Sequence, residues 1–147
     1  MKNDTYLDFF PTEQKAIDYA LWLNFKYRLA PSITFGVIHG PEDNWAVLET
    51  ITAKEMETSF LDNLPRDYTE LSYKEIKTLA EDNAPHPQWE MIRGLFSTVD
   101  GELLRFILHH KVPLEKFIRY ELASRGHDKD HRWCGYDKAC EIWLTDS

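Results

Sequence analysis

The pattern of apolar and polar residues divides the chain into a first third rich in strand-forming residues and a longer helical remainder. Three short runs of β-branched and aromatic residues, which are typical of strands, occur at 5–10, 33–39 and 45–51. Between the first two runs, Ile17, Leu21 and Phe25 recur every four positions, which predicts an amphipathic helix. The GPEDN segment between the last two runs predicts a hairpin turn. The first third therefore predicts the order β-α-β-β.

Beyond residue 51 the apolar period changes from two to about 3.6 residues, and we expect helices through the rest of the chain. Local signals predict where helices begin. Side-chain caps or capping boxes are expected at Thr12, at Thr52 with Glu55, at Ser72 with Glu75, and at Asp100. Proline predicts a first helical position at Pro87 and at Pro113. The first helix should end near Ala30, because Pro31 follows it, and Gly126 should end a later one.

Each predicted helix carries an apolar stripe that we expect to face a core. The stripes consist of Trp89, Ile92 and Phe96; Leu103, Leu104 and Ile107; and Leu114, Phe117, Ile118 and Leu122. In the last short helix, Cys140 and Trp143 are expected to lie inward beside Ala139. The pattern predicts an α+β fold, a small antiparallel β-sheet (β-α-β-β) followed by about five packed helices. We expect a single compact domain over residues 1–147, with sub-lobes at 1–52 and 53–147.

The composition excludes several classes of protein. A chain of 147 residues that is 43% hydrophobic and 14% aromatic can bury a core without a disulfide or a metal. Two cysteines do not make a disulfide framework, and no apolar run approaches the ~20 residues that span a bilayer. The chain has no glycine-rich phosphate loop, no HExxH motif and no GxSxG motif. We therefore expect a cytoplasmic protein with no membrane association and no cofactor.

The net charge of −8 is unevenly distributed along the chain. Residues 1–104 contain nine Lys and Arg against eighteen Asp and Glu. Residues 105–132 contain seven Lys and Arg against four Asp and Glu, and four of the six histidines. An acidic body of this kind favours a basic partner through long-range attraction.

Residues 127–140, HDKDHRWCGYDKAC, contain both cysteines of the chain. Four potential zinc ligands occur there: His127, His131, Cys134 and Cys140. Their spacing differs from that of common zinc fingers, in which two close pairs are separated by a longer loop. Because Cys140 is also expected on an inward helix face, where cysteine often serves as a small apolar residue, we predict no metal. The favoured interpretation is a structural loop that Trp133 and Tyr136 hold ahead of the last helix.

Two hypotheses assign chemistry to the basic segment 105–132. A small enzyme would draw its acid and base groups from His109, His110, Arg119, His127 and His131. A helix-turn-helix would expose Lys116, Arg119 and neighbouring side chains on its second helix. The net negative charge of the chain argues against nucleic acid as a partner, because phosphate binding depends on concentrated positive charge.

The leading hypothesis is a non-catalytic protein that binds a basic protein partner. It is motivated by the acidic body, the aromatic content and the missing catalytic motifs. Six residues are the candidate contacts: Glu42, Asp43, Trp45, Arg119, Arg132 and Trp133. An inhibitor or immunity-like role fits this pattern. In size and acidity, though in no motif, the chain resembles the small cytoplasmic proteins carried by bacterial mobile elements.

Overall fold

The computed structural model describes residues 8–30, 32–61 and 64–145. Contacts group the chain into two compact units, Met1–Gly94 and Leu95–Ser147, here called the first unit and the second unit and each described by itself. The predicted α+β fold with a small antiparallel sheet is confirmed. The single domain expected over residues 1–147 stays a prediction. None of the described helices has the length and apolar character that crossing a membrane would require.

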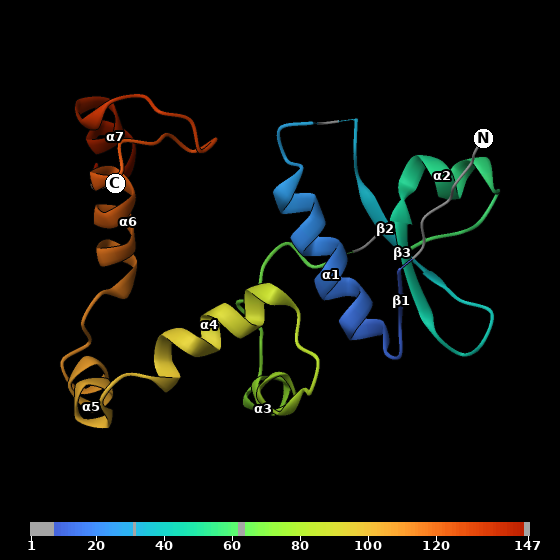
Figure 1. The fold of residues 1–147 in the computed structure, drawn as a ribbon, viewed down its shortest axis with the longest axis horizontal. Coiled ribbons are helices and arrows are strands. Elements are labelled where there is room, and N and C mark those ends of the chain that lie inside the picture. The colour runs from blue at the N-terminus through green and yellow to red at the C-terminus, as the bar shows by residue number, and fades with distance from the viewer. Residues whose placement is uncertain (1–7, 31, 62–63, 146–147) are drawn as a thin grey trace. The chain divides into compact units, whose positions relative to one another are not determined.

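The first unit is built on a three-stranded antiparallel sheet of order β1-β3-β2 (Figure 1). The strands are β1 (Asp8–Phe10), β2 (Phe35–His39) and β3 (Trp45–Glu49). The helices of this part of the chain are α1 (Glu13–Lys26), α2 (Thr50–Glu55), α3 (Tyr73–Glu81) and α4 (Pro87–Ser97), whose last three residues belong to the second unit. Residues 5–7 of the first predicted strand lie outside the described residues.

The core of the first unit lies where α1 packs on one face of the sheet. Ala16 and Ala20 of α1 are fully buried against Val37 and Val47, which are paired across β2 and β3. Alanine side chains let the helix approach the sheet closely, and the valines fill the space between the two layers. The opposite face of the sheet packs around Ile38, Ala46 and Leu48, with Ala53 of α2. Burial on both faces explains why β2 and β3 are nearly continuous apolar runs.

Most predicted helix ends are confirmed. Thr12 accepts a hydrogen bond from Lys15 N at the start of α1, and Ser72 and Glu75 form a complete capping box at the start of α3. Pro87 is the first residue of α4, and Asp100 caps the helix that begins at Gly101. The capping box predicted at Thr52 and Glu55 is wrong. The chain enters α2 directly from β3, so that Thr50 is the first helical residue. The first helix ends at Lys26, earlier than Ala30, because the backbone turns at Tyr27.

The second unit centres on the packing of α6 against α7 (Figure 1). Its helices are α5 (Gly101–His109), α6 (Leu114–Ser124) and α7 (Tyr136–Trp143). Ala123 of α6 and Ala139 of α7 are both buried. Gly126 follows α6 with a φ of +72°, and this confirms the predicted glycine cap.

The apolar stripes predicted to face inward are largely exposed in the structure. Phe117 and Ile118 of α6 are 62% and 61% exposed, and Ile92, Phe96, Leu103 and Leu114 are exposed as well. The prediction that these residues form a core is therefore wrong. The periodicity correctly identified amphipathic helices, but a periodic stripe does not specify which surface covers it.

Replacing Gly126 with alanine should destabilise the second unit. The left-handed backbone costs an alanine roughly 1–2 kcal/mol, and the added Cβ would also collide with the Trp133 ring. Gly94→Ala is a matched control inside α4, where an added Cβ meets nothing within 4 Å. It should stabilise the protein by about 0.5–1 kcal/mol. Chemical denaturation of both variants checks this, and equal effects would contradict it.

Candidate functional site

The hairpin between β2 and β3 places two of the predicted contact residues on the surface. Glu42 and Asp43 are exposed at its tip, and the turn closes through a hydrogen bond of 2.8 Å from Gly40 N to Asn44 O. Trp45 is half-buried, packs against the core of the first unit and meets His39 edge-to-face at 4.8 Å. The two carboxylates are therefore available to a partner, whereas Trp45 serves mainly to hold the hairpin on the core.

The loop after α6 is held by its own backbone. Asp128 N donates to Arg132 O at 2.8 Å, and the Asp128 carboxylate accepts from the backbone N–H groups of Asp130 and Arg132, both at 2.9 Å. These hydrogen bonds lower the pKa of Asp128, and the one from the Arg132 backbone has the largest effect. Trp133 is exposed and stands edge-to-face with the exposed ring of Tyr136 at 5.3 Å. An exposed aromatic pair of this kind is typical of an anchor in a protein interface.

The four potential zinc ligands are not gathered around one point. The rings of His127 and His131 stack at 4.9 Å, while Cys134 directs its thiol to Gly135 O at 3.6 Å. Cys140 is exposed, so the inward position predicted for it on α7 is wrong. In the described part of the chain, no group of three or more His, Cys, Asp or Glu side chains is arranged to hold a metal ion.

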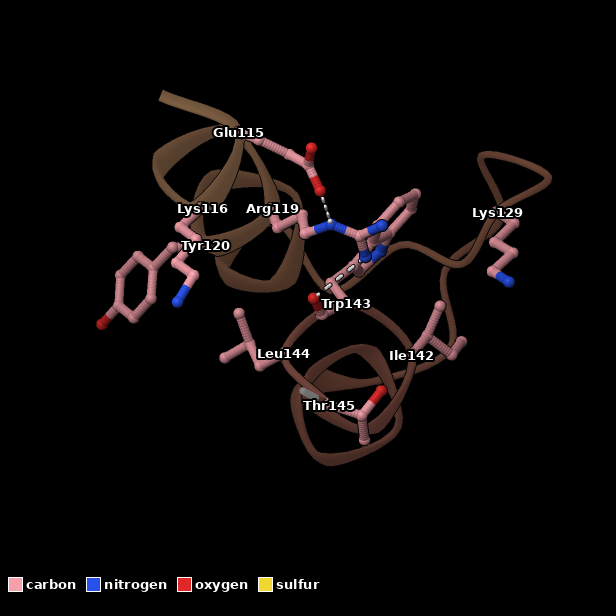
Figure 2. A pocket seen from close by; sticks show the side chains of 9 residues that line it. All are labelled: Glu115, Lys116, Arg119, Tyr120, Lys129, Ile142, Trp143, Leu144 and Thr145. Carbon is pink, nitrogen blue, oxygen red and sulfur yellow. Dashed lines mark hydrogen bonds and ion pairs between the residues drawn. The ribbon is translucent and has the colours of Figure 1, made fainter. Parts of the chain in front are cut away.

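Arg119 lies in a pocket of about 800 Å³ between α6 and α7 (Figure 2). Its Nε donates to Glu115 Oε2 at 3.1 Å, and its Nη1 donates to Trp143 O at 3.3 Å. Trp143 is half-buried and donates its indole N–H to His127 O at 2.8 Å. The guanidinium group therefore links α6 to the end of α7, and this structural role uses two of its donors.

This arrangement does not favour the two rival hypotheses. None of the four histidines of residues 105–132 lines the Arg119 pocket, and His109 and His110 belong to a separate pocket beside Arg105. A cleft that gathers two of those histidines with Arg119 would have favoured the enzyme hypothesis. The helix-turn-helix hypothesis expected Arg119 among the exposed side chains of its second helix, whereas this side chain is half-buried and bonded within the chain.

The face of α6 that points away from α7 borders an apolar groove of about 470 Å³. We define the apolar groove by Leu95, Phe96, Leu114, Phe117, Ile118 and Leu122. Leu114, Phe117 and Ile118 follow the i, i+3, i+4 spacing of one helix face. The Glu121 and Arg125 side chains also border the groove and pair with each other at 2.9 Å. An exposed apolar surface of this kind is typical of an interaction site.

A second feature, in the first unit, is the buried carboxylate of Asp18 on α1. The side chain is only 2% exposed, and its Oδ1 accepts hydrogen bonds from Gln14 Nε2 and Tyr68 Oη, both at 2.9 Å. His86 is also buried, with its ring in contact with those of Phe10 and Tyr19 and its Nε2 at 2.9 Å from Lys15 O.

Burial determines the electrostatics of this cluster. Removal from water raises the pKa of Asp18 because it disfavours the charged form. The hydrogen bonds from Tyr68 and Gln14, the field of His86 and a weaker contribution from the Trp89 indole N–H all act in the opposite direction. The Trp89 nitrogen is buried but forms no hydrogen bond with the described residues. Burial and the neighbouring carboxylate likewise raise the pKa of Tyr68.

Asp18 is a functional candidate that the sequence did not indicate, because the apolar pattern carries no signal for it. Asp18 is two positions from both Ala16 and Ala20, and two positions correspond to about 200° around a helix. It therefore lies on the side of α1 opposite the sheet, where a polar residue is expected to meet solvent. Only the packing of residues 68–89 against that side, which sequence periodicity does not report, buries it.

Comparison with protein-family models, with curated proteins and with solved structures finds no significant match for this chain. The function of this chain is therefore inferred from the geometry of the apolar groove and of the cluster around Asp18.

Replacing Asp18 with asparagine should stabilise the protein at pH 7. The folded state holds the Asp18 proton more tightly than the unfolded chain does, so ionisation of this group favours unfolding. That cost is absent below the ordinary carboxyl pKa of about 4 and grows as the pH rises through the raised pKa. Asparagine keeps an acceptor oxygen for Gln14 and Tyr68. Thermal melts at several pH values should show an advantage for Asp18→Asn that disappears in acid.

The matched control is Asp43→Asn at the exposed hairpin tip, which should change stability by no more than about 0.5 kcal/mol. An Asp18→Asn variant that is less stable than the parent protein at pH 7 would contradict the prediction, because it would show that the carboxylate stabilises the folded state.

Proposed function

We propose that the protein is a non-catalytic binding protein that recognises a basic protein partner through the apolar groove of the second unit. The observation that carries this proposal is the exposed stripe of Leu114, Phe117 and Ile118 on the side of α6 that α7 leaves uncovered. A single helix face bordered by a groove suits an amphipathic helix, because side chains spaced by three and four residues interdigitate between two helices.

The charge of the chain favours a basic helix over a second copy of the same chain. Two copies would bring together two bodies of net charge −8, and like charges oppose association. A partner with Lys and Arg on its polar face would be attracted before contact and held by apolar burial afterwards. Phe117 and Phe96 are the expected anchors, because aromatic side chains contribute much of the energy at interfaces.

The finer proposal is an inhibitor or immunity-like protein, cytoplasmic and carried by a mobile element. Its support is the small size, the acidity and the absence of a catalytic motif in the sequence. Binding alone is sufficient for such a role, since an inhibitor acts by occupying a surface of its target. The exposed carboxylates Glu42 and Asp43 would add to the attraction of a basic target.

Removing the apolar side chains of the groove should abolish partner binding without unfolding the protein. We would compare the parent protein with Phe117→Gln/Ile118→Gln, in which both exposed positions receive a polar helix-forming residue. Tagged proteins would be used to recover partners from the source cells, and a recovered basic protein would then be purified and titrated by calorimetry. The double variant should lose the complex and keep its helical circular dichroism spectrum.

The matched control is Phe106→Gln/Leu108→Gln on α5, which changes two exposed apolar residues outside the groove. It should bind like the parent protein. If every recovered protein binds the groove variant and the parent protein equally, or if the chain instead binds random duplex DNA in an Arg119-dependent manner, the proposal is wrong.

Salt should slow association of the purified pair more than it accelerates dissociation. The acidic surface acts over a screening length of ~10 Å at 0.1 M salt and ~3 Å at 1 M salt, whereas the groove contacts are apolar. Surface plasmon resonance across a salt series would separate the two rates. The double change Glu42→Gln/Asp43→Asn should lower the association rate and leave the dissociation rate nearly unchanged. A salt-independent association rate would exclude electrostatic attraction of the partner.

A further inference from the structure

The buried Asp18 carboxylate lines a cleft in the first unit. The cleft has a volume of about 450 Å³ and lies between α1 and the segment that joins α3 to α4. We define the Asp18 cleft by Lys15, Asp18, Glu81, Asp82, His86 and Trp89. Its size is within the range of about 300–1,000 Å³ that is typical of small-molecule sites.

No described Lys or Arg side chain pairs with Asp18 in this cleft, and the field of the nearby His86 offsets only part of the burial of the carboxylate. Its Oδ1 accepts from the neutral donors Gln14 and Tyr68, and among the described residues no Lys or Arg forms an ion pair with it. The nearby Lys15 ammonium is already used, at 2.9 Å from Asp82 Oδ2 and 2.7 Å from Ala84 O. Buried carboxylates are rarely left without a countercharge, so Asp18 resembles one half of an ion pair.

The rest of the lining favours the same kind of ligand. Three carboxylates, those of Asp18, Glu81 and Asp82, line the cleft against the single ammonium of Lys15. Trp89 contributes an aromatic side chain beside the buried carboxylate, and indole rings attract cations over their faces. A metal ion fits less well, because no group of three or more suitable ligands is assembled among the described residues.

We propose that the Asp18 cleft binds an organic cation, an ammonium or guanidinium group, with Asp18 as its counter-ion and Trp89 as an aromatic wall. The cation belongs either to a free small amine or to a Lys or Arg side chain of another protein. This site lies in the first unit, and the contacts that indicate it are independent of the apolar groove. Failure of either proposal therefore leaves the other intact.

Calorimetric titration with methylguanidinium and with n-butylammonium tests the proposal, with methylurea and n-butanol as neutral counterparts of similar shape. The cations should bind saturably and the neutral compounds should not. Asp18→Asn should weaken cation binding by at least about 30-fold, since a buried charge pair that loses one partner costs 2 kcal/mol or more. Asp137→Asn removes the same charge from an exposed position of α7 and should bind the cations like the parent protein.

The pH dependence of cation binding provides a second measurement, made on both the parent protein and Asp18→Asn. Methylguanidinium remains charged throughout, so its affinity should fall as acid protonates Asp18. Lys15, Asp82, His86 and Tyr68 also surround this carboxylate. His86, Glu81 and Asp82 remain present in Asp18→Asn, so the difference between the two titration curves isolates Asp18.

Two further ligands separate the sources of the cation. N-acetyl-arginine amide and N-acetyl-lysine amide present the same groups on a protein-like backbone. Tighter binding of these amides than of the simple cations indicates a protein side chain, and the reverse order indicates a free amine; either result supports the proposal. Absence of saturable binding by any cation, or equal binding by Asp18→Asn and the parent protein, would overturn it.

Discussion

The close approach of α1 to the sheet is the constraint on which the first unit depends. Ala16 and Ala20 have no exposed surface, and they pack directly on Val37 and Val47 at the centre of the sheet. Any larger side chain at either alanine would push the helix outward, because a packed interior has no room for added methylene groups. With this face fixed, the opposite side of α1 presents Asp18 to the segment between Tyr68 and Trp89.

The side of α1 that carries Asp18 reduces the stability of the fold, and the packing of Ala16 and Ala20 on the sheet offsets that loss. A buried carboxylate that pairs with no Lys or Arg of the described residues opposes folding near neutral pH. The hydrogen bonds from Tyr68 and Gln14 and the field of His86 compensate for only part of its desolvation. A neutral residue of the same shape would avoid this cost. Retaining the acid is easier to understand if the charge is used, since functional sites often keep groups that reduce stability. If Asp18 served only to stabilise the fold, Asp18→Asn would instead lower the stability of the protein at pH 7.

The sequence predicted those features that neighbouring residues determine. The caps at Ser72 and Asp100 depend on atoms two or three residues apart, and they formed as expected. The predictions failed where contacts with distant segments determine whether a residue is buried. The stripe of Phe117 and Ile118 indicated a helix face but not its partner, and the burial of Asp18 depends on a segment about fifty residues away. Periodicity describes one element at a time, whereas a site is assembled from several.

An exposed apolar groove and a large net negative charge on the same chain are mutually consistent. The groove around Phe117 would favour self-association if the protein were neutral, because exposed apolar surface associates readily. A charge of −8 on each copy opposes that outcome. Under the proposed function the same charge would attract a basic protein, so that repulsion between copies and attraction to such a partner would act together to keep the groove available. Under this proposal the charge would provide specificity by disfavouring acidic partners, and the apolar contact would provide affinity.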